Sequence, residues 1–137
     1  MLNKVTLIGN VGREPEVRVL ETGSKMARFT MATNEKYYTT NGKAAVHTEW
    51  HNIVTWRSVA TYVEKNVTVG DEIYVEGAIR SREAIDPRTK TSAMVYEIIA
   101  STVRLTSQKI TDQTSTTLGE DRQTDQFQID DPNELPF

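Results

Sequence analysis

Two tryptophans, Trp50 and Trp56, are the side chains of this sequence best suited to bind a flat molecule. They lie in the stretch from Thr48 to Trp56, whose β-branched and aromatic residues favour a β-strand over a helix. Side chains alternate between the two faces of a strand, so we expect both indoles on one face, about 20 Å apart at roughly 3.3 Å per residue. Exposed, the pair could stack with flat ligands; buried, it would belong to the hydrophobic core.

Other groups that carry chemistry are sparse. The chain has no cysteine, which excludes disulfides, thiolate metal sites and thiol catalysis. His47 and His51 lack a third ligand at metal-binding spacing. No nucleophile lies beside a base, and no glycine-rich phosphate loop or defined carboxylate pair is present. We therefore predict a protein without catalytic activity, metal or cofactor.

The elements that would position these side chains are mostly strands. Period-two patterns and turn signals predict extended segments at residues 4–9, 16–20, 25–33, 45–56, 72–82 and 93–105. Asn41-Gly42 predicts a hairpin turn, and Gly77 predicts a bulge. The aromatic residues expected in the core are Phe29, Tyr62, Tyr74 and Tyr96.

One short helix is predicted between the strands. Val59, Tyr62 and Val63 are spaced at i, i+3 and i+4, and Ser58 is a suitable N-cap. About five strands with a single helix between the third and fourth is the element order of the OB-fold, a Greek-key barrel that binds oligonucleotides or oligosaccharides. The predicted class is all-β.

Charge divides the chain into two parts. Residues 1–106 carry 14 Lys/Arg and 12 Asp/Glu, whereas residues 107–137 carry 2 and 7. Residues 107–129 are mostly polar and are predicted to be a disordered linker, followed by an acidic tip at residues 130–137. No signal segment or membrane span is predicted, so we expect a cytoplasmic protein.

The sequence resembles bacterial single-stranded DNA-binding proteins (SSBs). The matching pieces, in chain order, are residues 3–10, 15–18, 32–33, 48–51, 70–77 and 80–82, together with the tip Asp-Asp-Pro-Asn-Glu-Leu-Pro-Phe. This resemblance implies an OB-fold and usually a homotetramer. It implies sequence-independent binding and protection of single-stranded DNA in replication, recombination and repair, without catalysis and in association with the nucleoid.

The resemblance also implies roles for particular residues. The stacking aromatics of the family fall on Tyr37, Trp50 and Trp56, and a fourth falls on Ala84, where that platform is lost. His51 falls on a position used at a subunit interface. Arg80 and Arg82 share one face of a strand and are candidates for phosphate contacts, which make affinity depend on salt. The other candidate cations are Lys4, Arg18, Arg28, Lys36, Lys43, Arg57, Arg88 and Lys90.

The tip is the second predicted site. Its aromatic end could insert into an apolar pocket of a replication, recombination or repair protein, while its carboxylates pair with basic residues at the rim. The residues concerned are Asp130, Asp131, Glu134, Leu135, Pro136 and Phe137.

Two other interpretations remain open. One is an SSB-like protein-interaction subunit whose groove has lost DNA binding. Retention of both tryptophans and of the tip argues against it. The other is an oligosaccharide-binding OB module, which leaves the tip unexplained.

Overall fold

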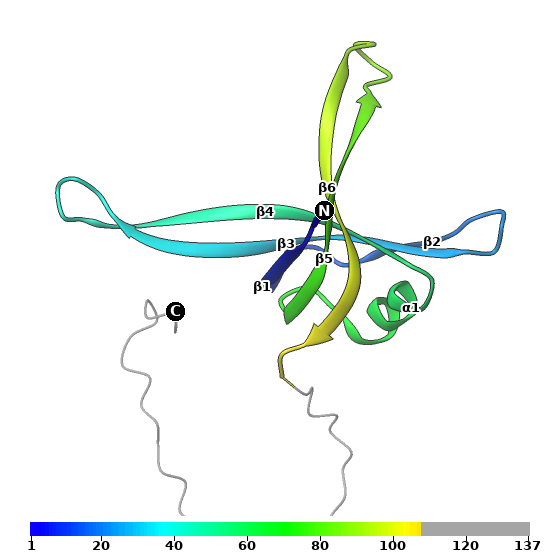
Figure 1. The fold of residues 1–137 in the computed structure, drawn as a ribbon, viewed down its shortest axis with the longest axis horizontal. Helices are drawn as coiled ribbons and strands as arrows, with labels where there is room; N and C mark the ends of the chain where they lie inside the picture. Colours follow the sequence, from blue (N-terminus) through cyan, green and yellow to red (C-terminus); the bar gives the residue numbers. More distant parts are fainter. Residues whose placement is uncertain (108–137) are drawn as a thin grey trace, which may run out of the picture.

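A computed structural model describes residues 1–107 (Figure 1). The predicted tip and all of the predicted linker except Ser107 lie outside this range. The elements in chain order are β1 (Val5–Val11), β2 (Glu16–Val19), β3 (Lys25–Tyr38), β4 (Ala44–Trp56), α1 (Arg57–Asn66), β5 (Glu72–Ile85) and β6 (Ser92–Leu105).

The strands form one sheet that closes on itself. Their order is β1-β5-β6-β4-β3-β2, and β1 also pairs with β3 at Asn10–Ala32 and Val11–Met31. Both β1 and β2 pair with β3 and are separated only by residues 12–15, so they act as one bent strand. Counted this way, the barrel has five strands with the helix between the third and fourth. The predicted OB-fold is confirmed.

The core lies where the inward faces of the strands meet the helix. Phe29 and Met31 of β3 and Ile53 of β4 are almost completely buried. Thr55 is buried beside them and donates its hydroxyl proton to the carbonyl of Ala27, with an oxygen–oxygen distance of 3.0 Å. The helix α1 packs against β3, β4 and β6 and buries Ala60 and Val63.

The start of α1 differs from the prediction. Strand β4 runs directly into the helix, so Trp56 occupies the N-cap position in place of Ser58. No side chain within residues 1–107 caps this end by a hydrogen bond. Arg57 takes a positive φ of 55°, which makes the sharp change of direction without an intervening loop. The predicted Ser58 cap was wrong because the strand continues to the residue before the helix.

Two long hairpins project from the barrel in different directions, β3–β4 and β5–β6 (Figure 1). The predicted hairpin turn at Asn41-Gly42 connects β3 and β4, and Gly42 has a φ of 75°, which glycine adopts without strain. A shift in register at Gly77 confirms the predicted bulge in β5. Because the β5–β6 hairpin extends beyond the barrel, Tyr96 is 65% exposed. Its predicted place in the core was wrong.

The other predicted core aromatics lie inside or beside the barrel. Phe29 is buried, and Tyr62 packs against the core from α1. The predicted core position of Tyr74 was wrong, because Ile73 and Val75 on either side of it face the core and Tyr74 points outward to Glu76. Within residues 1–107, no helix has the length and apolar character needed to span a membrane.

Candidate nucleic-acid interface

One face of the β3–β4 pair presents both tryptophans. Direct cross-strand partners share a face, and Trp50 lies opposite Ala32 while Trp56 lies opposite Met26. The side chains of Trp50 and Trp56 are 57% and 37% exposed. We define the Trp50 face as Met26, Arg28, Thr30 and Ala32 of β3 with Trp50, Asn52, Val54 and Trp56 of β4. The tryptophans are therefore surface residues on one face, as expected from the sequence, although Val54 between them on this face is buried.

A hollow beside Trp50 is lined in part by an arginine. It is lined by Gly12, Arg13, Thr30 and Trp50. Arg13 follows β1 directly after Gly12 and is exposed. Arg13 was not among the phosphate contacts predicted from the sequence, although a basic residue beside a glycine at the end of a strand is a visible signal. The hollow thus places a guanidinium close to an exposed indole.

Arginines also lie near Trp56. Arg18 of β2 pairs with Met26, and Glu16 pairs with Arg28, so these side chains extend the Trp50 face onto β2. They line a shared pocket, in which Arg18 contacts the Glu16 carboxylate at 3.2 Å. Both arginine side chains remain substantially exposed. Met26, the cross-strand partner of Trp56, lines the same pocket, so the two arginines lie on the strands next to Trp56.

A buried carboxylate lies beneath two of the arginines. Glu97 of β6 is 7% exposed, and its Oε1 lies 2.9 Å from Nε of Arg82 and 3.7 Å from a guanidinium nitrogen of Arg28. This joins β5 and β3 across the face. Glu97 was not predicted as a site residue, although a single acidic residue inside the apolar run from Val95 to Ala100 is a visible signal.

A second charged cluster lies on β1 and β5. Lys4 contacts Glu76 at 3.0 Å, and the Tyr74 hydroxyl donates to the same carboxylate at 2.7 Å. The hydrogen bond from Tyr74, followed by that from Lys4, lowers the pKa of Glu76 from its ordinary value. The hydrogen bond to Glu76 likewise raises the pKa values of Lys4 and Tyr74. Lys4 and Arg80 line one shallow groove beside this cluster.

The remaining residues predicted to contact DNA lie on the two hairpins and at the start of α1. Lys36 and Tyr37 on the β3–β4 hairpin, Lys43 in its turn and Arg57 at the start of α1 are all exposed. Tyr37 pairs with Ala45, which places it on the opposite face of the ribbon from Trp50; its exposed neighbour Tyr38 is on the Trp50 side. The predicted hairpin cations Arg88 and Lys90 are exposed near the tip of the β5–β6 hairpin.

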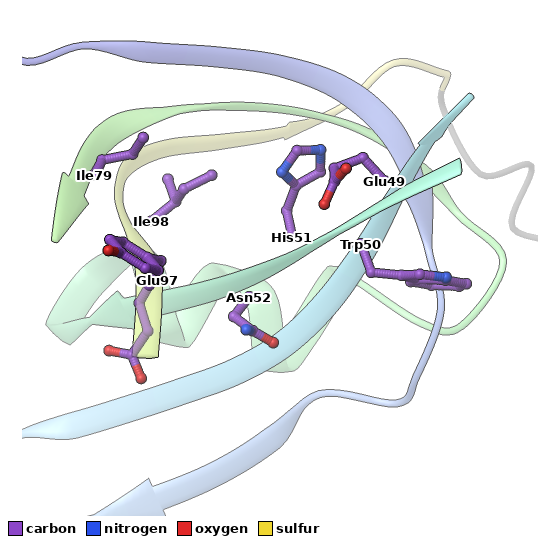
Figure 2. Close-up of a pocket in the computed structure, with 8 residues that line it drawn as sticks. Glu49, Trp50, His51, Asn52, Ile79, Glu97 and Ile98 are labelled. Carbon is purple, nitrogen blue, oxygen red and sulfur yellow. The ribbon is translucent and has the colours of Figure 1, made fainter. Parts of the chain in front are cut away.

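His51 lies on the other side of β4 from Trp50 (Figure 2). Its Nε2 is 2.9 Å from the Thr33 hydroxyl oxygen, and the ring lines a cleft with Ile79 and Ile98. The His51 ring thus points away from the Trp50 indole, although Trp50 and Asn52 line the same cleft. Residues 1–107 contain no group of three or more His, Cys, Asp or Glu side chains close enough together to bind a metal ion.

The β5–β6 hairpin has two chemically different faces. Arg80 pairs with Glu97 and Arg82 with Val95, which places both arginines on one face, as predicted. The opposite face carries exposed apolar side chains from both strands: Ile79, Ile85, Met94 and Tyr96. Ala84 lies opposite Ala93, so this part of the hairpin carries two small aliphatic side chains.

Exposed aromatic rings among arginines on the surface of an OB barrel are the features of the class of oligonucleotide-binding OB-folds. The comparison with family models narrows this class. The chain belongs to the single-strand binding protein family, whose model matches residues 2–106. Proteins of this family are non-enzymatic, which agrees with the prediction of no catalytic activity.

Relatives and solved structures agree with this assignment. The chain is 44% identical over 112 residues to a single-stranded DNA-binding protein of Bacteroides thetaiotaomicron, covering 79% of this chain and 68% of that protein. It is 36% identical over 104 residues to one of Neisseria meningitidis serogroup A, covering 76% of this chain and 59% of that protein. A Plasmodium falciparum SSB in complex with single-stranded DNA has a TM-score of 0.72 at 30% identity, covering 78% of this chain and 96% of that one.

Proposed function

We propose that this protein binds single-stranded DNA without sequence preference. The observation that carries the proposal is the exposure of Trp50 and Trp56 on one face of a barrel from this family. Bases stack on aromatic rings at about 1–3 kcal/mol per base, and every base has a π-face, so such binding tolerates any sequence. An indole that packed the core instead would be buried.

The cations around the tryptophans support a path for the phosphates. Arg18 and Arg28 line a pocket with Met26, the cross-strand partner of Trp56. Arg13 lines a hollow with Trp50, and Arg82 of β5 shares the Glu97 carboxylate with Arg28. We propose that single-stranded DNA crosses the Trp50 face and continues along the two hairpins. Lys36 and Lys43 would serve on one hairpin and Arg80 on the other, with Lys4 and Arg57 as peripheral contacts. Tyr37, on the opposite face of its hairpin from Trp50, would stack a base where the strand passes around that hairpin.

Binding to matched oligonucleotides tests this proposal. We expect oligo-dT, oligo-dC and a mixed single strand to bind with similar affinity, and a duplex of the mixed sequence to bind far more weakly. Affinity for the single strands should fall as salt rises, with a slope of about −0.7 per phosphate contact in log–log form. Equal affinity for the duplex would contradict the proposal. No binding to any strand would favour an SSB-like interaction subunit instead.

We also propose that the protein forms a homotetramer. Ile79, Met94 and Tyr96 present an apolar surface on the β5–β6 hairpin, and such patches commonly mark protein interfaces. Within the described residues, Val5–Gly9 of β1 pair with β5 along one edge, which leaves their other edge for a partner strand. The cleft beside His51 adjoins the same apolar surface.

Sedimentation equilibrium tests the oligomer. A tetrameric mass is expected for the full chain, and Tyr96→Asp with Met94→Asp should lower it because two charges would be buried at the interface. Both side chains are exposed in the single subunit, so the variant should keep its far-ultraviolet circular dichroism. A monomeric mass for the unmodified chain would contradict the proposal.

The proposed cellular role is protection of single strands exposed in replication, recombination and repair, at the nucleoid. Family membership supports this role. The acidic tip, residues 130–137, would recruit proteins that act on the same DNA. The tip lies outside the described residues, and its composition supports the proposal: carboxylates are followed by Leu135, Pro136 and Phe137.

A further inference from the structure

The indole of Trp50 meets Gly12 on the far side of β3. Gly12 follows β1 and donates its backbone N–H to Thr30 of β3, while Trp50 pairs with Ala32 on the opposite edge of that strand. A Cβ atom placed on Gly12 would lie 2.8 Å from Cη2 of the indole and closer still to Cζ3. Carbon atoms pack best at about 3.5–4.0 Å. The six-membered ring of Trp50 therefore fills the space that a side chain at position 12 would need.

The backbone at position 12 does not itself require glycine. Gly12 is exposed, and it is not one of the glycines with a positive φ, which are Gly23, Gly42 and Gly70. An alanine could adopt its backbone conformation without the strain that a left-handed residue carries. The reason for glycine at this position is therefore space beside the backbone.

Gly12 differs from two other glycines in the kind of atom that an added Cβ would meet. At Gly9 and Gly77 a Cβ would collide with backbone carbonyls, those of Ala32 and Ile99, so these glycines serve the close approach of strands. At Gly12, the neighbours that a Cβ would meet within residues 1–107 are side-chain atoms of Trp50 and Thr30. A substitution at Gly12 would thus move the indole and leave the barrel in place.

We propose that Gly12 is a positioning residue for the Trp50 stacking platform. The absent side chain lets the indole extend across β3 to the hollow that Arg13 lines. A base stacked on Trp50 would then have the Arg13 guanidinium near its phosphate. A Cβ at position 12 pushes the indole away from that hollow and separates the two contacts. This inference rests on the proposed function, because the position of the ring affects binding only if Trp50 stacks with bases.

A double-mutant cycle tests the inference through oligo-dT affinity. Gly12→Ala should weaken binding by about 3- to 10-fold, because a displaced indole loses part of the affinity that one stacked base contributes. In a Trp50→Ala background, the same substitution should change affinity by less than about twofold, because the group it displaces is gone. An equal loss in both backgrounds would overturn the inference, as would unchanged affinity for Gly12→Ala in the otherwise unmodified chain.

A spectroscopic measurement separates failure of this inference from failure of the proposed function. In a Trp56→Phe chain, Trp50 is the sole tryptophan and its fluorescence reports its own surroundings. Gly12→Ala in this chain should increase acrylamide quenching, because the displaced indole becomes more accessible. Unchanged quenching would overturn the positioning role even if Trp50→Ala weakens DNA binding. Increased quenching with no effect of Trp50→Ala on affinity would sustain the positioning role and refute stacking.

Discussion

The Oε1 atom of Glu97 lies 2.9 Å from Nε of Arg82, with the carboxylate buried and the guanidinium half-exposed. A second arginine, Arg28, approaches the same oxygen at 3.7 Å. Glu97 therefore ties two cations of the proposed DNA face to the barrel and also offsets part of their charge. These two effects act on DNA binding in opposite directions.

Replacing Glu97 with glutamine should strengthen binding to oligo-dT at low salt. The amide keeps the shape and can still accept a hydrogen bond from Arg82, but it no longer offsets the positive charge that both arginines offer to phosphates. The log–log salt slope should steepen by about 0.7 for each additional phosphate that the arginines bind. Weaker binding with an unchanged slope would mean that Glu97 acts by holding the arginines in place.

The same substitution should lower stability. A hydrogen bond between charged groups contributes about 1.5–3 kcal/mol, and the neutral amide retains only part of this. Urea unfolding of Glu97→Gln should therefore show a lower midpoint with an unchanged slope. Ser92→Ala, a change of an exposed side chain on the same strand, provides the control for substitution in β6.

Trp56→Ala should weaken oligo-dT binding by about 1–3 kcal/mol, the contribution of one stacked base. Trp56 is 37% exposed, so the barrel should still form and unfold cooperatively. Affinity is measured by titration and folding by circular dichroism. If the variant loses its cooperative unfolding transition, Trp56 supports the packing between β4 and α1 and its role in stacking is refuted.

Glu76 should titrate below its ordinary pKa of 4.5, chiefly because the Tyr74 hydroxyl donates a hydrogen bond to its carboxylate. A lowered folded-state pKa stabilises the fold above the unfolded-state value, and this contribution is lost as pH falls through the folded-state pKa. Tyr74→Phe should raise the Glu76 midpoint in a carboxyl-carbon NMR titration. An identical midpoint in both proteins would show that the hydroxyl does not control this carboxylate.

Removing Phe137 should leave oligo-dT affinity unchanged, because the residue lies outside the matched domain at residues 2–106. It should abolish capture of repair and replication proteins by the immobilised chain, since the apolar anchor of the tip is lost. Leu118→Ala, in the predicted linker, is the matched control. Equal capture by the shortened chain would refute the proposed role of the tip.

The period of a strand was sufficient to predict the Trp50 face. Trp50 and Trp56 are exposed and Ile53 and Thr55 on the other face are buried, whereas Val54 is buried although it lies on the Trp50 face. The hairpin aromatics could not be assigned in this way. Whether Tyr37 or Tyr38 shares a face with Trp50 depends on cross-strand register, which a single strand's pattern does not contain.

Burial was predicted wrongly from the sequence where a strand extends beyond the barrel into a hairpin. Tyr96 lies in an apolar run but on a hairpin that leaves the core, and the pattern does not reveal where a strand becomes exposed. Glu97 shows the reverse case, a charge buried because arginines from two other strands meet it. Such contacts between distant segments require the three-dimensional arrangement.

Tryptophan fluorescence during titration with poly-dT, at two salt concentrations, tests the central claim most directly. Trp50 and Trp56 are the two tryptophans of the chain, and both lie on the proposed stacking face. Strong quenching that saturates at lower poly-dT concentration in low salt is the predicted result. Unchanged emission while poly-dT demonstrably binds would contradict stacking on the Trp50 face.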